Sequence, residues 1–217
     1  MELFHVLNRG VEKRDIFLDD RDRFRFTHGL ALFNTNTAAN NTTYFIDNAY
    51  NDFVNRYEKP IVDIHGWCLM RNHYHLLLSA KVDGGITKFI RKLNVGYANY
   101  FNARYKHEGS LFQGRTKKIL INSDAHFLHI LNYIHLNPLD YVSGAREWRK
   151  RSLTNTEAAI KQLSTYRWSS YSDYCDRKNF PSILTTDLFG EKSGAFEKKT
   201  ISYLKDLKSL PKEYLLE

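Results

Sequence analysis

The sequence predicts an α+β fold with an antiparallel hairpin between helices. Two runs of strand-forming residues, IVDIHGWCLM at 61–70 and HYHLLLSA at 73–80, are separated only by Arg71 and Asn72, and strands joined so tightly pair antiparallel. On both sides of the hairpin, apolar residues recur at intervals of three and four, as in amphipathic helices. With 217 residues, 42% of them hydrophobic, the chain can form one main core and an extension.

Before the hairpin, the chain predicts a strand, a helix and a loop. Residues 4–7 are apolar enough for a short strand, and Asp19 or Asp20 can cap the helix that follows. The polar run NTNTAANNTT at 34–43 is typical of a surface loop and marks an insertion in the domain. A further helix is expected at 44–57.

After the hairpin, the pattern predicts a long helix at 86–105 and a strand at 115–121. A second helix at 124–136 would begin after Ser123 and end at Pro138, since Ser caps helices and Pro stops them. Its core-facing positions are expected to be Phe127, Leu128, Leu131 and Ile134. Beyond it, the chain is expected to be mostly helical.

Cysteine content and hydropathy exclude several classes of protein. Cys68 and Cys175 are the only cysteines, too few for a disulfide framework or a thiolate zinc site. The N-terminus has no secretory pattern and no apolar stretch has the length that spans a bilayer. We therefore expect a cytoplasmic protein without a membrane partner.

Basic charge is concentrated in one part of the chain. Lys and Arg number 32 against 24 Asp and Glu, and residues 86–151 alone hold twelve basic and four acidic residues. A concentrated basic surface is what a polyphosphate partner requires, because its binding releases condensed counterions. The charge therefore favours a nucleic acid, the alternative being an ordinary solvated surface.

His73 and His75 form a candidate metal pair. They alternate along the second hairpin strand, so both imidazoles project from one face of the sheet. Such a pair on a rigid strand could hold Mg²⁺ or Mn²⁺, and zinc would be equally natural for imidazole ligands. The alternative is a pair of structural histidines within a core.

Tyr133 and Asn137 form the second candidate pair, because residues four apart are neighbours on a helix face. Cleavage of a phosphodiester needs an oxygen nucleophile and positive charge against the phosphate. Tyr133 could supply the oxygen, and the Asn137 amide oxygen could complete a metal's ligand set. The product would be a 5′-phosphotyrosine and a free 3′-hydroxyl. Alternatively, Tyr133 packs in the core and Asn137 caps the helix.

These motifs lead to a family resemblance. The run HGWCLMRNHYHLLL resembles the histidine-hydrophobic-histidine signature of the HUH endonuclease superfamily, and with YIHLNP at 133–138 it is similar to the single-tyrosine (Y1) transposases related to IS200. The motifs that most resemble REP-associated tyrosine transposases are FHVLNRG at 4–10, IFLDD at 16–20, GSLFQGR at 109–115 and YRWSSY at 166–171. The resemblance covers about residues 4–174.

The resemblance implies a ferredoxin-like antiparallel sheet with helices packed on one face. It also implies metal-dependent strand transfer on single-stranded DNA beside a hairpin, with Mg²⁺ or Mn²⁺. His73 and His75 match the family's metal-binding pair, Tyr133 the nucleophile and Asn137 the third polar ligand. REP-associated members imply a monomer, whereas insertion-sequence members imply a dimer. In this sequence Asn137 is shorter than the glutamine of many relatives, and Arg71 replaces a frequent proline.

Two domains are expected on this basis. Residues 1–142 would form the nuclease domain, with the polar insertion at 34–43, and residues 143–217 a C-terminal extension packed on the core. The extension could contact DNA or cover the active site. The expected phosphate contacts are basic residues in loops, on the long helix and at a strand's start, namely Arg9, Lys13, Arg14, Arg71, Arg91, Lys92, Arg115, Lys117 and Lys118. Phe112 and Trp67 are either base-stacking or core aromatics.

Three other functions use the same residues. A rolling-circle replication initiator or relaxase shares the metal and tyrosine chemistry, although such proteins usually carry further domains. A domesticated protein could bind DNA hairpins without turnover. A zinc hydrolase built on His73 and His75 would leave Tyr133 without a role.

Overall fold

The computed structural model describes residues 1–37, 59–150, 153–190 and 194–206. The helix expected at 44–57 and most of the insertion at 34–43 lie outside these residues. The chain forms two compact units, one of Met1–Ile64 with Arg71–Leu120, the other of His65–Met70 with Ile121–Glu217. They are called the first and the second unit below. The predicted division into residues 1–142 and 143–217 stays a prediction.

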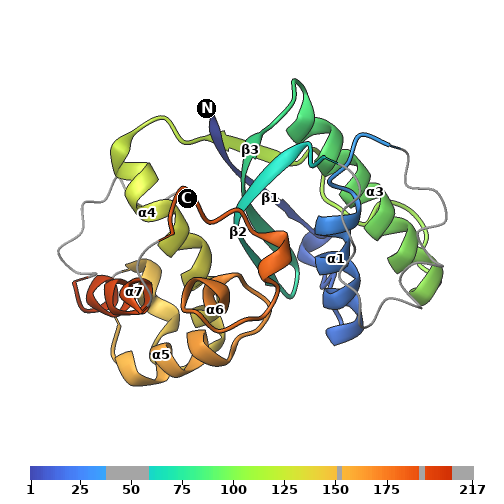
Figure 1. Cartoon of the computed structure of the whole chain (residues 1–217). Helices are drawn as coiled ribbons and strands as arrows, with labels where there is room; N and C mark the ends of the chain where they lie inside the picture. Colours follow the sequence, from blue (N-terminus) through green and yellow to red (C-terminus); the bar gives the residue numbers. More distant parts are fainter. Residues whose placement is uncertain (38–58, 151–152, 191–193, 207–217) are drawn as a thin grey trace. The chain divides into compact units, whose positions relative to one another are not determined.

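A four-stranded antiparallel sheet carries the N-terminal half of the chain (Figure 1). Its elements, in chain order, are β1 (Leu3–Arg9), α1 (Asp20–Leu32), β2 (Val62–Met70), β3 (His73–Ala80), α3 (Gly85–Tyr105) and β4 (Lys117–Leu120). The strands lie in the order β2-β3-β1-β4. This strand order, with a helix after β1 and after β3, is the predicted ferredoxin-like α+β arrangement, which is confirmed.

Helices α1 and α3 of the first unit cover one face of its strands. The Tyr74 ring lies 4.8 Å from that of Phe26 on α1, between ring centroids, and its hydroxyl donates to Asn94 Oδ1 on α3 at 2.8 Å. The Thr116 hydroxyl accepts from both the Asn94 and the Asn8 amide at 3.0 Å. The predicted packing of helices on one face is confirmed, and Tyr74 marks that face.

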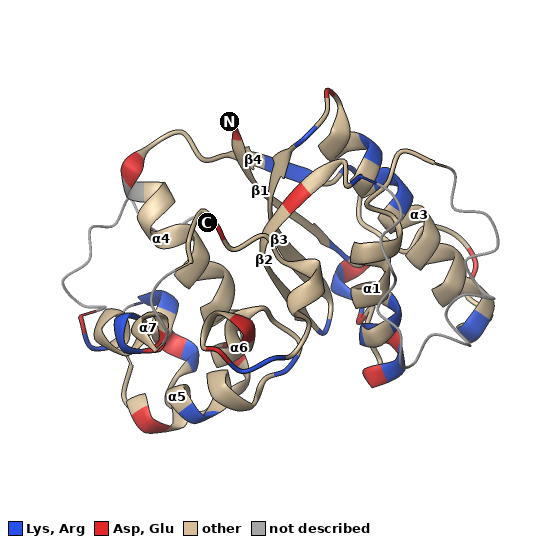
Figure 2. Ribbon diagram, viewed as in Figure 1, with Lys and Arg blue, Asp and Glu red and all other residues tan. Residues whose placement is uncertain are grey.

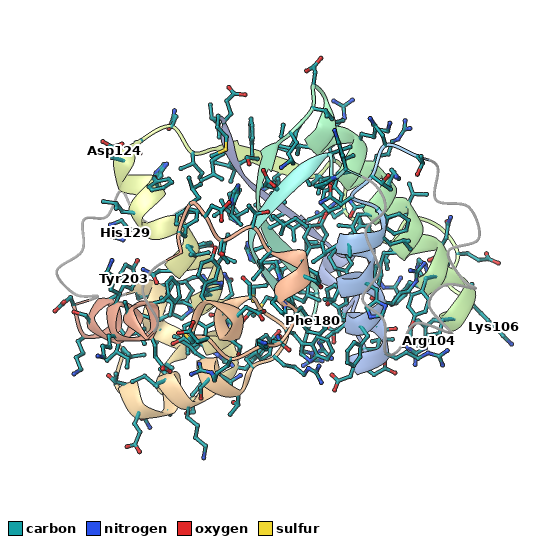
Figure 3. All side chains as sticks on the ribbon, viewed as in Figure 1. Arg104, Lys106, Asp124, His129, Phe180 and Tyr203 are labelled. Carbon is teal, nitrogen blue, oxygen red and sulfur yellow. The ribbon has the colours of Figure 1, made fainter. Side chains whose placement is uncertain are left out.

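A buried carboxylate joins the ends of the two helices. Asp19 caps α1 by accepting from the Asp22 backbone N–H at 3.0 Å, while Asp22 itself is fully buried. Its carboxylate accepts from the hydroxyls of Tyr100 and Tyr105 at 3.0 and 2.9 Å. Arg104, near the end of α3 (Figure 3), donates to the same group at 2.7 Å. The three bonds to Asp22 from Tyr100, Tyr105 and Arg104 tie α1 to α3.

The second unit is mostly helical, as predicted for the C-terminal part. Its elements are α4 (Asp124–Leu136), α5 (Thr156–Thr165), α6 (Tyr171–Tyr174), α7 (Ala195–Lys205) and short 3₁₀ turns at Asn137–Tyr141, Arg146–Lys150 and Pro181–Ile183. Ser123 caps α4, as expected, by accepting from the His126 backbone N–H. In Figure 3, His129 of α4 faces Tyr203 of α7, with 5.4 Å between ring centroids.

Leu128 is a correction to the predicted helix face. It is 67% exposed, whereas Leu131 and Ile134 are buried as expected. At about 100° per residue, Leu128 lies about 160° around the helix from the buried Ile130, so the buried stripe takes in Ile130 and leaves Leu128 on the exposed side. Among the described residues, no helix has the length and apolar character needed to cross a membrane.

The motif YRWSSY binds the second half of β2. The Trp67 backbone N–H donates to the Ser170 hydroxyl at 2.9 Å, and the Leu69 N–H donates to the Trp168 carbonyl, also at 2.9 Å. The Tyr166 hydroxyl donates to the Leu69 carbonyl at 2.6 Å. Trp168 is only 5% exposed, so its side chain anchors this segment.

Candidate functional site

His73 and His75 project from the sheet face opposite α1 and α3. In the antiparallel register, Arg9 pairs with His73 and Leu7 with His75, and residues that pair directly place their side chains on the same face. Tyr74, between the two histidines, points to the helices instead. The predicted sharing of one strand face therefore follows from the observed register.

Both histidines have their Nδ1 atom in a hydrogen bond. His73 Nδ1 lies 2.6 Å from the Asn72 side-chain oxygen, and His75 Nδ1 lies 2.9 Å from His5 Nε2. The Asn72 amide nitrogen donates to the Lys13 carbonyl at 3.0 Å. A carbonyl can only accept, so this bond identifies the other Asn72 atom as oxygen and makes His73 Nδ1 the donor.

The two rings lie close to each other and to a third histidine. The ring centroids of His73 and His75 are 4.9 Å apart with planes at 80°, while His5 stacks on His75 at 5.1 Å and 14°. His5 is 1% exposed and His75 3% exposed. Burial lowers the pKa of His5 to about 4, because the charged imidazolium is poorly solvated there. His5 therefore stays neutral at pH 7.

This arrangement fits a divalent metal at the histidine pair. Metal-binding histidines usually donate one ring N–H to a fixed acceptor and use the other nitrogen as ligand. His73 meets the first part of that condition, with Nδ1 bonded to Asn72, and Nε2 would then be the nitrogen that binds a metal. Within the described part of the chain, no group of three or more His, Cys, Asp or Glu side chains could hold a metal ion.

Tyr133 is buried near the end of α4. It is 3% exposed, and its ring lies 5.7 Å from that of Trp148, between centroids. The guanidinium carbon of Arg149 lies 6.0 Å from the Tyr133 ring centroid and 4.4 Å from that of Trp148. Arg149 also pairs with Asp140. The Arg149 guanidinium and the Trp148 indole therefore hold the ring of Tyr133, the predicted nucleophile.

Asn137 makes its observed contacts within the second unit. Its amide nitrogen donates to the carbonyls of Tyr133 and Ile134 at 2.9 and 3.2 Å, and its side-chain oxygen accepts from Arg149 at 2.6 Å. The residue is fully buried. The Arg149 guanidinium therefore occupies one of the two lone pairs of this oxygen. Its ligand role stays a prediction.

The histidine pair belongs to the first unit and the Tyr133–Asn137 pair to the second. The structure brings each pair together as the sequence predicts, on one strand face and at one helix end. The assembly of both pairs into a single centre stays a prediction.

The predicted phosphate contacts all lie in the first unit. Figure 2 shows Lys and Arg along β4 and α3. Lys117 pairs with Leu7, so it lies on the histidine face together with Arg9. Lys118 lies on the opposite face and donates to the Thr87 hydroxyl of α3 at 3.0 Å. The side chains of these two adjacent lysines therefore lie on opposite faces of the sheet.

Like Lys118, several other predicted contacts have protein partners. Arg71 pairs with Asp15 at 2.5 Å, and Lys92 donates to the carbonyls of Thr35 and Thr37 at 2.8 and 2.7 Å. The Arg14 guanidinium contacts His107. The exposed members of the predicted set are Lys13, Arg14, Arg71, Arg91, Arg115, Lys117 and Lys118. Phe112 and Trp67, at 8% and 0% exposure, are core aromatics.

Three residues that the sequence did not single out contact the two candidate pairs. Asn72 and His5 contact the histidine pair, and Arg149 contacts Tyr133 and Asn137. Asn72 precedes the histidine motif directly, which is a local signal. His5 and His75 are 70 positions apart and Arg149 is twelve beyond Asn137, so only the fold reveals these contacts.

Comparison with known families confirms the resemblance predicted from the motifs. Residues 37–137 match the family described as "Transposase IS200 like". The matched segment contains the histidine pair on β3 as well as Tyr133 and Asn137 at the end of α4. Over these residues the chain is similar to IS200-like transposases.

A solved structure of a REP-associated tyrosine transposase bound to a REP hairpin is also similar. It shares 13% sequence identity with this chain, the alignment covers 89% of this chain and 90% of that one, and the TM-score is 0.49. No curated protein matches the sequence.

Proposed function

We propose that this protein is a metal-dependent single-stranded DNA endonuclease and strand transferase that acts beside DNA hairpins. The observation that carries the proposal is the histidine pair, which lies on one strand face with each Nδ1 engaged, in a segment that matches IS200-like transposases. The proposed metal ligands are the Nε2 atoms of His73 and His75. Mg²⁺ or Mn²⁺ bound there would supply positive charge against phosphate oxygens.

Tyr133 is the proposed nucleophile. Its hydroxyl oxygen would attack the phosphorus in line with the P–O3′ bond, so that an O–P bond to tyrosine forms and the P–O3′ bond breaks. The leaving O3′ takes a proton in place of the one that tyrosine loses. The products are a 5′-phosphotyrosine and a 3′-hydroxyl. Attack by a 3′-hydroxyl on the phosphotyrosine reverses these steps and rejoins a strand.

Arg149 is placed to support this chemistry. A guanidinium near the Tyr133 ring favours negative charge that develops on the phenol oxygen. On the first unit, Arg9 and Lys117 share the histidine face and are the proposed backbone contacts for the strand next to the scissile phosphate. The proposed substrate is single-stranded DNA beside a hairpin, bound by one copy of the chain.

A second candidate function is hairpin DNA binding without turnover. Tyr133 is 3% exposed, and the Asn137 side-chain oxygen is held by Arg149. A nucleophile must become accessible before it can attack, and a protein that had lost catalysis would have no need for that step. The two functions differ in whether DNA becomes covalently attached.

The test is incubation of the protein with labelled hairpin oligonucleotides that carry single-stranded flanks, in Mn²⁺, followed by a denaturing gel. The expected result is a covalent adduct with the wild type and with Tyr141→Phe, a matched control for an exposed tyrosine eight residues further on. Tyr133→Phe should give none. His73→Ala and His75→Ala should lose cleavage and keep DNA binding.

Each other outcome has a definite meaning. Hairpin binding without any adduct supports the binding protein instead. An adduct that survives Tyr133→Phe shows that another residue is the nucleophile. Cleavage that survives both histidine substitutions excludes the metal site.

A further inference from the structure

We propose that His5 and Asn72 are positioning residues, which hold His75 and His73 in the tautomer that presents Nε2 to a metal ion. This inference rests on the proposed metal site and extends it to the residues behind the ligands. Neither residue contacts the reacting atoms in this scheme. Each acts through the histidine to which it is hydrogen-bonded.

The bond at His73 has only one consistent assignment. Asn72 donates its amide N–H to the Lys13 carbonyl at 3.0 Å, so its side-chain oxygen is the atom 2.6 Å from His73 Nδ1. An oxygen accepts, and the hydrogen therefore lies on His73 Nδ1. In a neutral imidazole the lone pair is then on Nε2, the proposed ligand atom.

The backbone that carries Asn72 is itself held by the loop that follows β1. The Gly10 N–H donates to the Asn72 carbonyl at 2.8 Å, and the backbone N–H groups of Ile16 and Phe17 donate to the Arg71 carbonyl at 2.9 and 3.0 Å. The turn between β2 and β3 is thus held from several directions. A fixed acceptor, in turn, fixes the ring that donates to it.

His5 plays the corresponding part for His75. It lies on β1 opposite Leu77, one diagonal position away from His75 on the same sheet face, which is within reach of aromatic side chains. The two rings stack at 14° with His5 Nε2 2.9 Å from His75 Nδ1. If His5 accepts in this bond, His75 carries its hydrogen on Nδ1 and both ligands present Nε2.

The opposite direction of this bond is the competing arrangement. A hydrogen on His5 Nε2 would make His75 Nδ1 the acceptor and place the His75 hydrogen on Nε2, where a metal could not bind without tautomer exchange. The two arrangements differ in the position of one hydrogen, which ¹⁵N–¹H spectra of the imidazole rings detect directly.

The experiment uses the full chain without DNA or metal for the spectra, and then Mn²⁺ alone for titration. In the wild type, both His73 and His75 should be Nδ1–H tautomers. His5→Phe keeps a ring but removes the acceptor, and should mix the His75 tautomers and weaken Mn²⁺ binding about 10- to 100-fold. His5→Gln places an acceptor oxygen near the position of Nε2 and should restore most of the affinity.

The matched pair at the other ligand is Asn72→Ala against Asn72→Asp. The alanine variant should release the His73 tautomer and weaken Mn²⁺ binding by a similar factor, whereas the aspartate retains the acceptor. Thermal unfolding of each variant separates a local effect from loss of the fold.

An Nε2–H tautomer of His75 in the wild type would overturn the role of His5. So would unchanged tautomer and Mn²⁺ affinity in His5→Phe, or equal losses in His5→Phe and His5→Gln. If the wild type binds no Mn²⁺, the metal site of the proposed function is wrong, while the tautomers of the metal-free protein still decide whether His5 and Asn72 set them.

Discussion

The histidine pair and the Tyr133–Asn137 pair differ in what their polar atoms contact. On the first unit, the Nδ1 atoms of both histidines are hydrogen-bonded within the protein. On the second unit, Arg149 takes the Asn137 oxygen, and Tyr133 is 3% exposed between Trp148 and Arg149. Two residues that share one face can therefore be oriented for a ligand by their hydrogen bonds, or their polar atoms can be bound by other residues of their own unit.

The difference follows from the elements that carry the two pairs. A strand in the middle of a sheet is fixed on both sides, and β3 lies between β2 and β1. Tyr133 and Asn137 stand where α4 passes into a 3₁₀ turn at Pro138, and the backbone there needs side-chain partners. Asn137 supplies such a partner, as a capping residue would.

The largest expected effect is on the stability of the first unit. Asp22→Ala removes the buried acceptor of Tyr100, Tyr105 and Arg104, and should lower the free energy of unfolding by about 3–5 kcal/mol, because buried donors lose their partner. Urea denaturation measures this loss. Lys81→Ala breaks the more exposed pair with Asp63 and should change stability by less than about 1 kcal/mol. Equal losses would show that the Asp22 network does not hold α1 to α3.

The second unit should respond to pH through a buried histidine. Burial lowers the pKa of His135 from 6.5 to about 3. Between these values the unfolded chain binds a proton that the folded chain does not, so stability falls as pH falls below about 6.5. His135→Gln removes this titration and can still bond to Ser170.

The measurement is the unfolding free energy at pH 7 and pH 5. The wild type should lose about 2 kcal/mol more than His135→Gln over this range, at about 1.4 kcal/mol per pH unit below 6.5. Parallel losses in the two proteins would mean that His135 is charged in the folded state.

Arg149→Lys tests whether the second pair needs its guanidinium. A lysine cannot both stack on Trp148 and donate to Asn137 and Asp140 in the same geometry. Adduct formation should fall about 10-fold, equivalent to about 1.4 kcal/mol, while Mn²⁺ affinity stays unchanged. Lys150→Ala is the control, since its side chain is 79% exposed. A loss of Mn²⁺ affinity in Arg149→Lys would show that the residues around Asn137 take part in metal binding.

The smallest effect is expected from two adjacent lysines on opposite sheet faces. Lys117→Ala should weaken binding of hairpin DNA and reduce the salt dependence of log K by about one phosphate contact. Lys118→Ala breaks a contact with Thr87 and should leave that slope unchanged. Equal salt dependence of log K for the two variants would show that the DNA does not run along the histidine face.

The sequence by itself determined the sheet hairpin, the helices at α1, α3 and α4, and the placing of each candidate pair on one face. Periodicity, caps such as Asp19 and Ser123, and the stop at Pro138 act over a few residues, so they can be read without the fold. The family match over residues 37–137 agrees with the motifs that these elements carry.

Only the tertiary structure decided which polar atoms of these residues are hydrogen-bonded. His5 meets His75 across 70 positions, Arg149 reaches Asn137 from the next turn, and Lys117 and Lys118 separate onto two faces through the register of β4 with β1. These contacts depend on how distant segments pair and pack, and no local pattern encodes that. The residues of the two candidate pairs follow from the sequence, but the partners that prepare or restrain them follow from the fold.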